Sequence, residues 1–276
     1  MAARVWRAGL GIGLLWLGVT AAGAADVTWY PEDDLFYRLV ADPKTPQNFT
    51  MVADLEQEAA DESITAWLVG IGETFGIYRL DGDDDAWSLQ LEIFAAAFAQ
   101  FDLTGPSNAL LNTDYQVGGT VALRRGRFSS RFRMFHQSSH LGDELILGPD
   151  PPERVNLSYE AVDAMVAVEI KGWRPYLGGS YAVRVSPDRL DRGLAHAGIE
   201  YGHPSGWFFA VDAKWLQERD WDPGVSVMTG YRVGRNKGPL GRAMSLRLVY
   251  YDGVSPYGQF FAQDTEYLGG GMWFRF

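Results

Sequence analysis

The sequence contains no cysteine, no stretch dominated by basic residues and, after its first 25 residues, no segment with the length and uniform hydrophobicity of a transmembrane helix. The lack of cysteine excludes disulfides and thiol chemistry. The 24 Lys and Arg residues are outnumbered by 35 Asp and Glu residues, which gives a net charge of −11. Because this acidic balance repels polyphosphate, we expect no nucleic acid partner.

The first 25 residues have the three-part order of a secretory signal peptide. Arg4 and Arg7 are followed by an apolar run over residues 8–19, and small residues occupy positions 22–25. This run is shorter than the ~20 residues that a spanning helix needs, which disfavours a single membrane anchor. We therefore predict a signal peptide over residues 1–25, with cleavage before Ala25 or Asp26.

Stretches that alternate between apolar and polar residues fill the rest of the chain. In residues 86–101, one face carries Trp87, Leu89, Leu91 and Ile93, and the other carries Ser88, Gln90 and Glu92. This alternation fits both a soluble β-sandwich and a transmembrane β-barrel with its apolar side chains outward. The signal peptide, the outward tryptophans and the terminal Phe276 favour the barrel. A carboxy-terminal aromatic residue resembles the assembly signal of outer-membrane barrels, which implies the barrel assembly machinery as a partner.

The alternating segments predict an all-β, antiparallel transmembrane β-barrel of about 12 strands, an even number as in bacterial barrels. The expected strands are 48–57, 63–80, 86–101, 114–124, 127–139, 154–170, 173–185, 191–202, 206–217, 225–236, 242–253 and 265–276. Short turns alternate with longer connections, and we place the short turns in the periplasm and the longer loops outside the cell.

The mature chain is thus predicted to have two parts. Residues 26–47 form a periplasmic amino-terminal segment, and residues 48–276 form the outer-membrane barrel. The expected location is the outer membrane of a Gram-negative-type bacterium, where the outward face of the barrel contacts outer-membrane lipids.

The apolar face of one predicted strand ends in reactive side chains. Over residues 128–140 this face carries Phe128, Ser130, Phe132, Met134, His136, Ser138 and His140. His136 and Ser138 are two positions apart near the outer end of the strand, so the imidazole can act as a base toward the hydroxyl. The pair predicts a lipid-facing catalytic site. The plain alternative is that these polar residues only mark the entry of the strand into the headgroup region.

Two resemblances extend this interpretation. The runs LVADPKTPQNF and HQSSHLGDE resemble a bacterial outer-membrane family described as a domain of unknown function, which implies a fold and a compartment. The His-Gln-Ser segment resembles outer-membrane phospholipase A, whose HQSNG segment places a nucleophilic serine and a base histidine on the lipid-facing surface. It resembles more loosely the His-x-Ser pair of the outer-membrane lipid A deacylase. In this chain Ser139 and His140 stand where Asn and Gly follow the serine.

A third member of the site is expected on the next strand. Without a bulge, the alternation over residues 155–170 puts Asn156 outward, and we expect it opposite His136 as the residue that orients the imidazole. A bulge near Glu160 would instead turn Asn156 into the lumen. The loop between the two strands carries candidate ligands for calcium, as the phospholipase resemblance suggests: Asp143 and Glu144, with Asp150 and Glu153 further along. A solvated acidic loop is the alternative.

Two functions remain open from the sequence. One is a lipid-facing serine hydrolase that cleaves acyl esters of phospholipid or lipid A, with Ser138, His136 and Asn156 as its site. The other is a noncatalytic outer-membrane barrel, either a small channel or a structural or lipid-organising protein.

Overall fold

The computed structural model describes residues 26–57, 63–82, 86–105, 107–147, 155–203, 205–233 and 243–275. The predicted signal peptide and Phe276 lie outside the described residues. No helix within these ranges is both long and apolar enough to cross a membrane.

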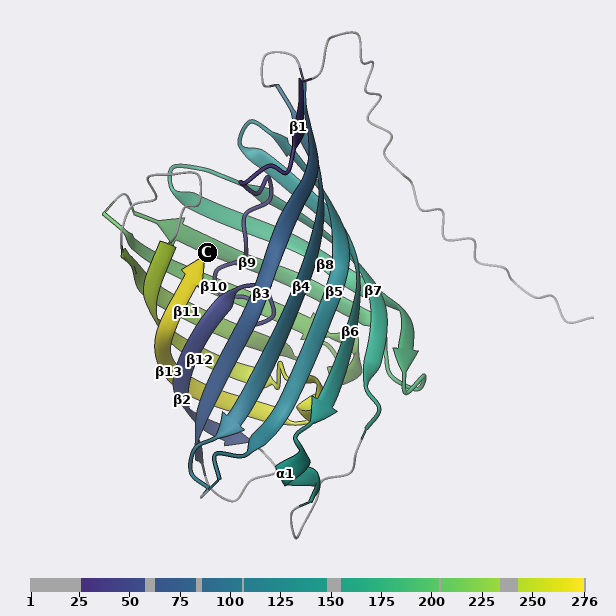
Figure 1. Ribbon diagram of the computed structural model, residues 1–276, viewed down its shortest axis with the longest axis vertical. Coiled ribbons are helices and arrows are strands. Elements are labelled where there is room, and N and C mark those ends of the chain that lie inside the picture. The colour runs from purple at the N-terminus through teal and green to yellow at the C-terminus, as the bar shows by residue number, and fades with distance from the viewer. Residues whose placement is uncertain are drawn as a thin grey trace, which may run out of the picture.

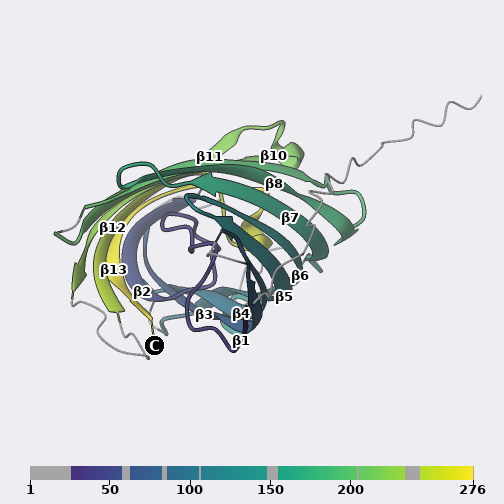
Figure 2. The ribbon, with the colours of Figure 1, turned by 90° about the horizontal axis from the view of Figure 1, so that it is seen from above.

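Twelve strands form a closed antiparallel barrel, which confirms the predicted fold class (Figures 1 and 2). Each strand pairs with its neighbours in the chain, and β13 pairs with β2 to close the ring. The strands are β2 (Asn48–Gln57), β3 (Ile64–Asp81), β4 (Ser88–Asp102), β5 (Leu110–Arg125), β6 (Phe128–Leu141), β7 (Ser158–Val168), β8 (Trp173–Ser186), β9 (Gly193–Gly202), β10 (Trp207–Leu216), β11 (Pro223–Val233), β12 (Ala243–Val254) and β13 (Asp264–Arg275).

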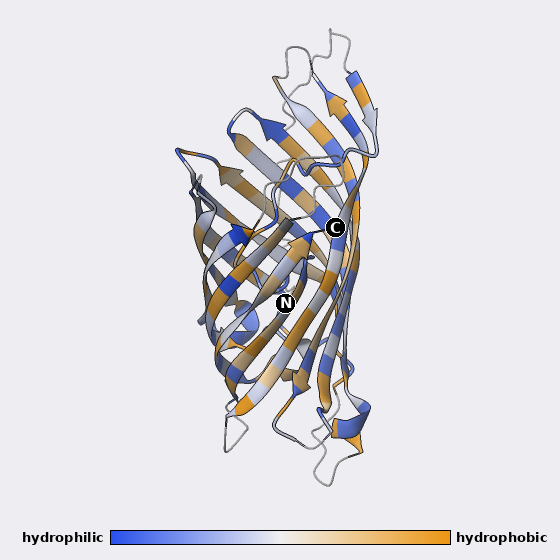
Figure 3. Ribbon diagram, turned by 60° about the vertical axis from the view of Figure 1, so that its left-hand side comes forward, coloured by the Kyte–Doolittle hydropathy of each residue, from blue (hydrophilic) through white to orange (hydrophobic). Residues whose placement is uncertain are grey.

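Each strand sends alternate side chains to lipid and to the lumen, because successive residues of a strand point to opposite faces. On β12, Leu246 and Leu248 are exposed, whereas Ser245 and Val249, which flank them in the strand, are buried. Figure 3 shows the same alternation of hydrophobic and hydrophilic residues along the other strands. A closed barrel with an apolar outer face is the architecture that β-strands use to cross the outer membrane.

The shortest turns lie at one end of the barrel and the longest connection lies at the other. Short turns such as Gly126-Arg127 lie at the end where β1 (Asp26–Trp29) extends the sheet by pairing with the last residues of β3. The opposite end carries the longer connections, among them those with α1 (Asp143–Ile146), η2 (Gln217–Arg219) and η3 (Gly258–Phe260) (Figure 1). We assign this second end to the outside of the cell.

The segment before the barrel lies inside it, which corrects the expectation of a separate segment in the periplasm. Residues 31–47 enter the lumen, where Leu35, Phe36 and Leu39 are buried in one cluster with inward residues of the wall (Figure 2). We call residues 31–47 the plug. A ring of twelve strands is wider than its own side chains fill, so apolar residues of the plug gain burial there.

Ion pairs hold the plug to the wall. Lys44 Nζ lies 2.6 Å from Asp114 Oδ2, and Lys214 Nζ lies 2.5 Å from Asp42 Oδ1. Burial is the largest single influence and raises the pKa of Asp42, but the charges of Lys214 and His196, together with hydrogen bonds from Lys214 and from the backbone N–H of Lys44, hold this pKa below its usual value. Asp42 is therefore ionised at neutral pH and binds Lys214 as a full charge.

We predict that Asp42→Asn destabilises the folded barrel by roughly 3–5 kcal/mol, because it leaves the Lys214 ammonium without its carboxylate in a buried site. The lowered pKa means that the contribution of Asp42 is present above about pH 4 and is lost as the pH falls further. Urea unfolding in lipid vesicles at neutral and acidic pH measures both effects.

The matched control is Asp33→Asn, since Asp33 pairs with Arg79 at 2.9 Å but its side chain is 74% exposed. This change should cost no more than about 1 kcal/mol. Equal losses from the two substitutions would contradict a role for Asp42 in holding the plug.

Candidate functional site

His136 and Ser138 lie on the outward face of β6, near its outer end. The residues that alternate with them, Gln137 and Ser139, are buried in the lumen. Ser139 is fixed there by hydrogen bonds from its hydroxyl to Asp114 and to Asn112. The two serines of the HQSSH run are thus in different surroundings, and Ser138 alone shares a face with His136.

The hydroxyl of Ser138 is free to donate a hydrogen bond to a base. Within the part of the chain that the structure describes, Ser138 makes no side-chain hydrogen bond. Its neighbours across the sheet are Tyr115 on β5 and Ser158 on β7. No hydrogen bond joins the Ser138 hydroxyl to His136 in the described part of the chain, and hydrogen bonds between a nucleophile and its base are often long or poorly aligned without substrate.

Glu160 on β7 lies directly opposite His136. Its Oε1 is 3.5 Å from His136 Nδ1, and its Oε2 is 3.4 Å from Nε of Arg184 on β8. The backbone N–H of Ser139 donates to the carbonyl of Leu157, which makes the rows of Ser138 and His136 the close, non-hydrogen-bonded rows of the ladder. Side chains approach each other most closely in such rows, and Glu160 is therefore well placed to orient the imidazole.

Asn156 does not occupy the position that we predicted. It points outward and is exposed, so the bulge-free alternation is correct and the alternative lumen-facing arrangement is wrong. However, Ser138 pairs with Ser158, so the same register places Asn156 at the level of His140. The expected position of Asn156 opposite His136 is wrong, and Glu160 stands there instead. The register of β6 against β7, together with the face, identifies Glu160.

The candidate calcium ligands are not gathered into a site. Asp143 and Glu144 form the first turn of α1, and both are exposed. Among the described residues, no group of three or more His, Asp or Glu side chains lies in a metal-binding arrangement. Asp150 and Glu153 of the same loop lie outside the described residues. Calcium stays a prediction.

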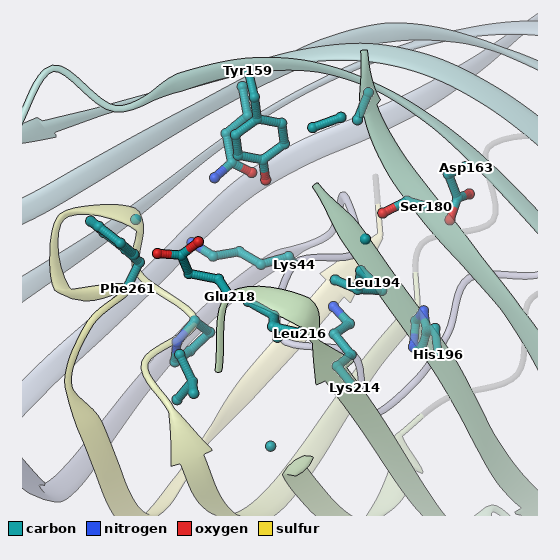
Figure 4. Close-up of a pocket in the computed structure, with 18 of the residues that line it drawn as sticks. Lys44, Tyr159, Asp163, Ser180, Leu194, His196, Lys214, Leu216, Glu218 and Phe261 are labelled. Atoms are coloured by element: carbon teal, nitrogen blue, oxygen red, sulfur yellow. The ribbon is translucent and has the colours of Figure 1, made fainter. Parts of the chain in front are cut away.

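A hollow lies inside the barrel, with a volume of about 230 Å³ (Figure 4). The plug contributes Asp42 and Lys44 to its lining, and the wall contributes His196, Lys214 and Arg133. The sequence did not reveal this chamber because the plug that forms part of its wall was expected outside the barrel.

Several charged side chains of this chamber are paired with one another. Lys214 pairs with Asp42, Arg133 Nε lies 2.9 Å from Asp163, and His196 Nε2 lies 2.6 Å from Asp212. Asp212 also accepts a hydrogen bond from Tyr176. Since these side chains are already engaged with one another, we place the candidate site on the outer face.

Comparisons with known proteins agree with the fold. The family described as "Protein of unknown function (DUF1207)" matches residues 19–276. The outer membrane phospholipase of Salmonella typhi, solved as a dimer with bound calcium, is similar with a TM-score of 0.62 and 11% identity over 88% of this chain and 94% of that one. The outer membrane phospholipase A of Escherichia coli is similar with a TM-score of 0.61 and 11% identity over 83% and 96%. No curated protein matches the sequence.

We predict that the register of this hairpin can be read with engineered cysteines, since the chain has none of its own. Ser138→Cys with Ser158→Cys should form a disulfide on mild oxidation, because the two residues face each other in a close row. Ser138→Cys with Asn156→Cys should stay reduced. Thiol alkylation and mass measurement of the folded protein distinguish them, and the reverse pattern would restore Asn156 to the site.

Proposed function

Since this chain belongs to the DUF1207 family of proteins of unknown function, we propose its function from its own side chains: a lipid-facing serine hydrolase that cleaves acyl esters of phospholipid or lipid A. One observation carries the proposal. An outward serine and histidine share one strand face, and a carboxylate on the next strand lies 3.5 Å from the histidine.

The chemistry follows the order of these contacts. Glu160 is beside Nδ1 of His136, so Nε2 is the nitrogen left for Ser138. As Ser138 Oγ bonds to the ester carbonyl carbon, Nε2 takes the hydroxyl proton and later gives it to the departing alcohol. Nε2 then takes a proton from water while the water oxygen attacks the acyl-serine carbonyl. As the fatty acid leaves, Nε2 gives this proton to the Ser138 oxygen. Ser138 and His136 are the catalytic residues, and Glu160 is a positioning residue.

The depth of the site suits a lipid ester. β6 ends at Leu141, three residues beyond Ser138, so the hydroxyl lies close to the outer membrane–water interface. Ester carbonyls of membrane lipids lie between headgroup and hydrocarbon, and they can reach Ser138 without leaving the bilayer. The similarity to two outer-membrane phospholipases supports the proposal at the level of the fold.

We predict that Ser138→Ala and His136→Ala each abolish the release of fatty acid from phospholipid or lipid A in detergent micelles. The matched control is Ser130→Ala, because Ser130 is on the same strand and faces outward but lies eight residues from Ser138. It should keep the wild-type rate. A serine-directed phosphonate should label Ser138 in the wild type and in Ser130→Ala, and heat-modifiable migration checks the folding of each variant.

The measurement also decides between the two classes of function. If folded wild-type protein, supplied with calcium, releases no fatty acid from any of these lipids and takes no label, the noncatalytic barrel is the correct interpretation. His136 and Ser138 would then be the polar end of a membrane strand.

Glu160→Gln should lower the labelling rate of Ser138 by roughly tenfold to a hundredfold, because an amide holds the imidazole less firmly and can favour the wrong tautomer. Glu160→Asp, which keeps the charge, should restore part of the rate. Asn156→Ala should change the rate by less than about twofold, because Asn156 lies two rows from His136. The opposite order, with Asn156→Ala the slower variant, would assign the positioning role to Asn156.

A further inference from the structure

The outer surface of the barrel is hollowed beside His136. A groove of about 420 Å³ crosses the outward faces of β3, β4 and β5 and is lined at one end by His136. Its apolar lining consists of Ile71, Phe75, Ala95, Ala97, Tyr115 and Val117. We call this hollow the outer groove.

The outer groove exists because small residues lie between large ones. Ala97 on β4 is paired with Ile71 on one side and Tyr115 on the other. Ala95, two residues along the same face, is paired with Val117. Ile71 and Val117 are both more than half exposed and flank the alanines, so β4 is the floor, or lowest part, of the groove, and the path from His136 to it passes over Val117. Most other outward positions of β4, such as Leu91 and Ile93, carry large side chains that would fill such a floor.

The groove runs from the proposed catalytic residues into the bilayer. One row of the sheet joins His136, Val117, Ala95 and Glu73 across three strand spacings, roughly 14 Å. His136 is five residues from the outer end of β6 (141 − 136), whereas Glu73 is nine residues from the outer end of β3 (73 − 64). Because the strands are tilted (Figure 1), this row descends from the outer interface toward the middle of the membrane.

A polar cluster closes the far end of the groove. The Glu73 carboxylate accepts hydrogen bonds from Arg38 of the plug at 2.5 Å and from Asn48 at 3.0 Å. β2 begins at Asn48, so this cluster fills the place where the plug meets the wall. Its polar groups are hydrogen-bonded to one another and make no favourable contact with a hydrocarbon chain. The apolar part of the groove therefore has a definite length.

We propose that the outer groove binds the long hydrocarbon chain of the ester whose carbonyl lies at Ser138, and that it gives the protein a preference for long-chain acyl esters. This inference rests on the proposed hydrolase function and names its substrate class. Three features single out an acyl chain as the occupant. Between His136 and the Glu73 cluster the outward side chains that line the groove are apolar, the groove begins at the catalytic histidine, and it descends in the direction that a lipid chain takes from its ester bond.

The test fills the groove and compares two substrates. Ala95→Phe and Ala97→Phe place a ring on the floor, and hydrolysis is measured in micelles with a butyrate ester and a palmitate ester of the same alcohol. The control is Ala164→Phe, because Ala164 is an exposed, outward alanine on β7 that does not line the groove. We expect both groove variants to lose on the order of tenfold in rate on palmitate and to keep the wild-type rate on butyrate, while the control keeps both rates.

Each other outcome has a distinct meaning. Equal loss on both esters, or no loss on either, overturns the acyl groove and leaves the hydrolase function standing. If the variants instead change the oligomeric state in detergent, measured by light scattering, and lower both rates together, the groove seats a second copy of the chain. If the wild type hydrolyses neither ester, the proposed function itself fails and the groove proposal fails with it.

Discussion

Closure of the sheet is the constraint on which the rest of this structure depends. In hydrocarbon an unpaired backbone N–H or C=O has no water to bind, so the strands must close on themselves. The pairing of β13 with β2 completes the ring. A closed ring has only two faces, and a strand period of two assigns each residue to one of them. Gln137 and Ser139 are therefore lumen residues, while His136 and Ser138 face lipid.

The lumen follows from the same closure. Twelve strands leave more interior than their inward side chains occupy, and the plug fills part of it with Leu39 and with Lys44, whose ammonium meets Asp114. Part of the remaining space is the chamber beside His196 and Lys214, where Lys214 is paired with Asp42 and His196 with Asp212. A lumen filled in this way, in the described part of the chain, gives the inward charges a structural role and leaves the outer face as the place for chemistry.

The strands could be predicted from the sequence because burial in lipid and burial in the lumen both act on single residues, and alternation shows both. The predicted span 48–57 is identical to β2. Relations between distant residues could not be predicted this way. The plug is found only when its charges meet Asp114 and Lys214, and Glu160 is found only when the register across a long loop is known. Asn156 was given the right face and the wrong row for this reason.

The order of side chains along the outward face is the strongest argument for a lipid substrate. On the lipid face an Arg or Lys side chain costs roughly 2–4 kcal/mol at the bilayer midplane and about 0–1 near the interfaces, and an acidic side chain costs less, so His136 and Glu160 are tolerated near the outer end of the barrel. That argument alone also explains a noncatalytic strand end. It does not explain why alanines lie at the bottom of a groove that is lined by His136 at one end and flanked by Ile71 and Val117. From this polar site the outer groove leads toward the membrane centre between apolar side chains. This order matches the order of groups in a lipid, in which the ester comes first and the hydrocarbon chain follows.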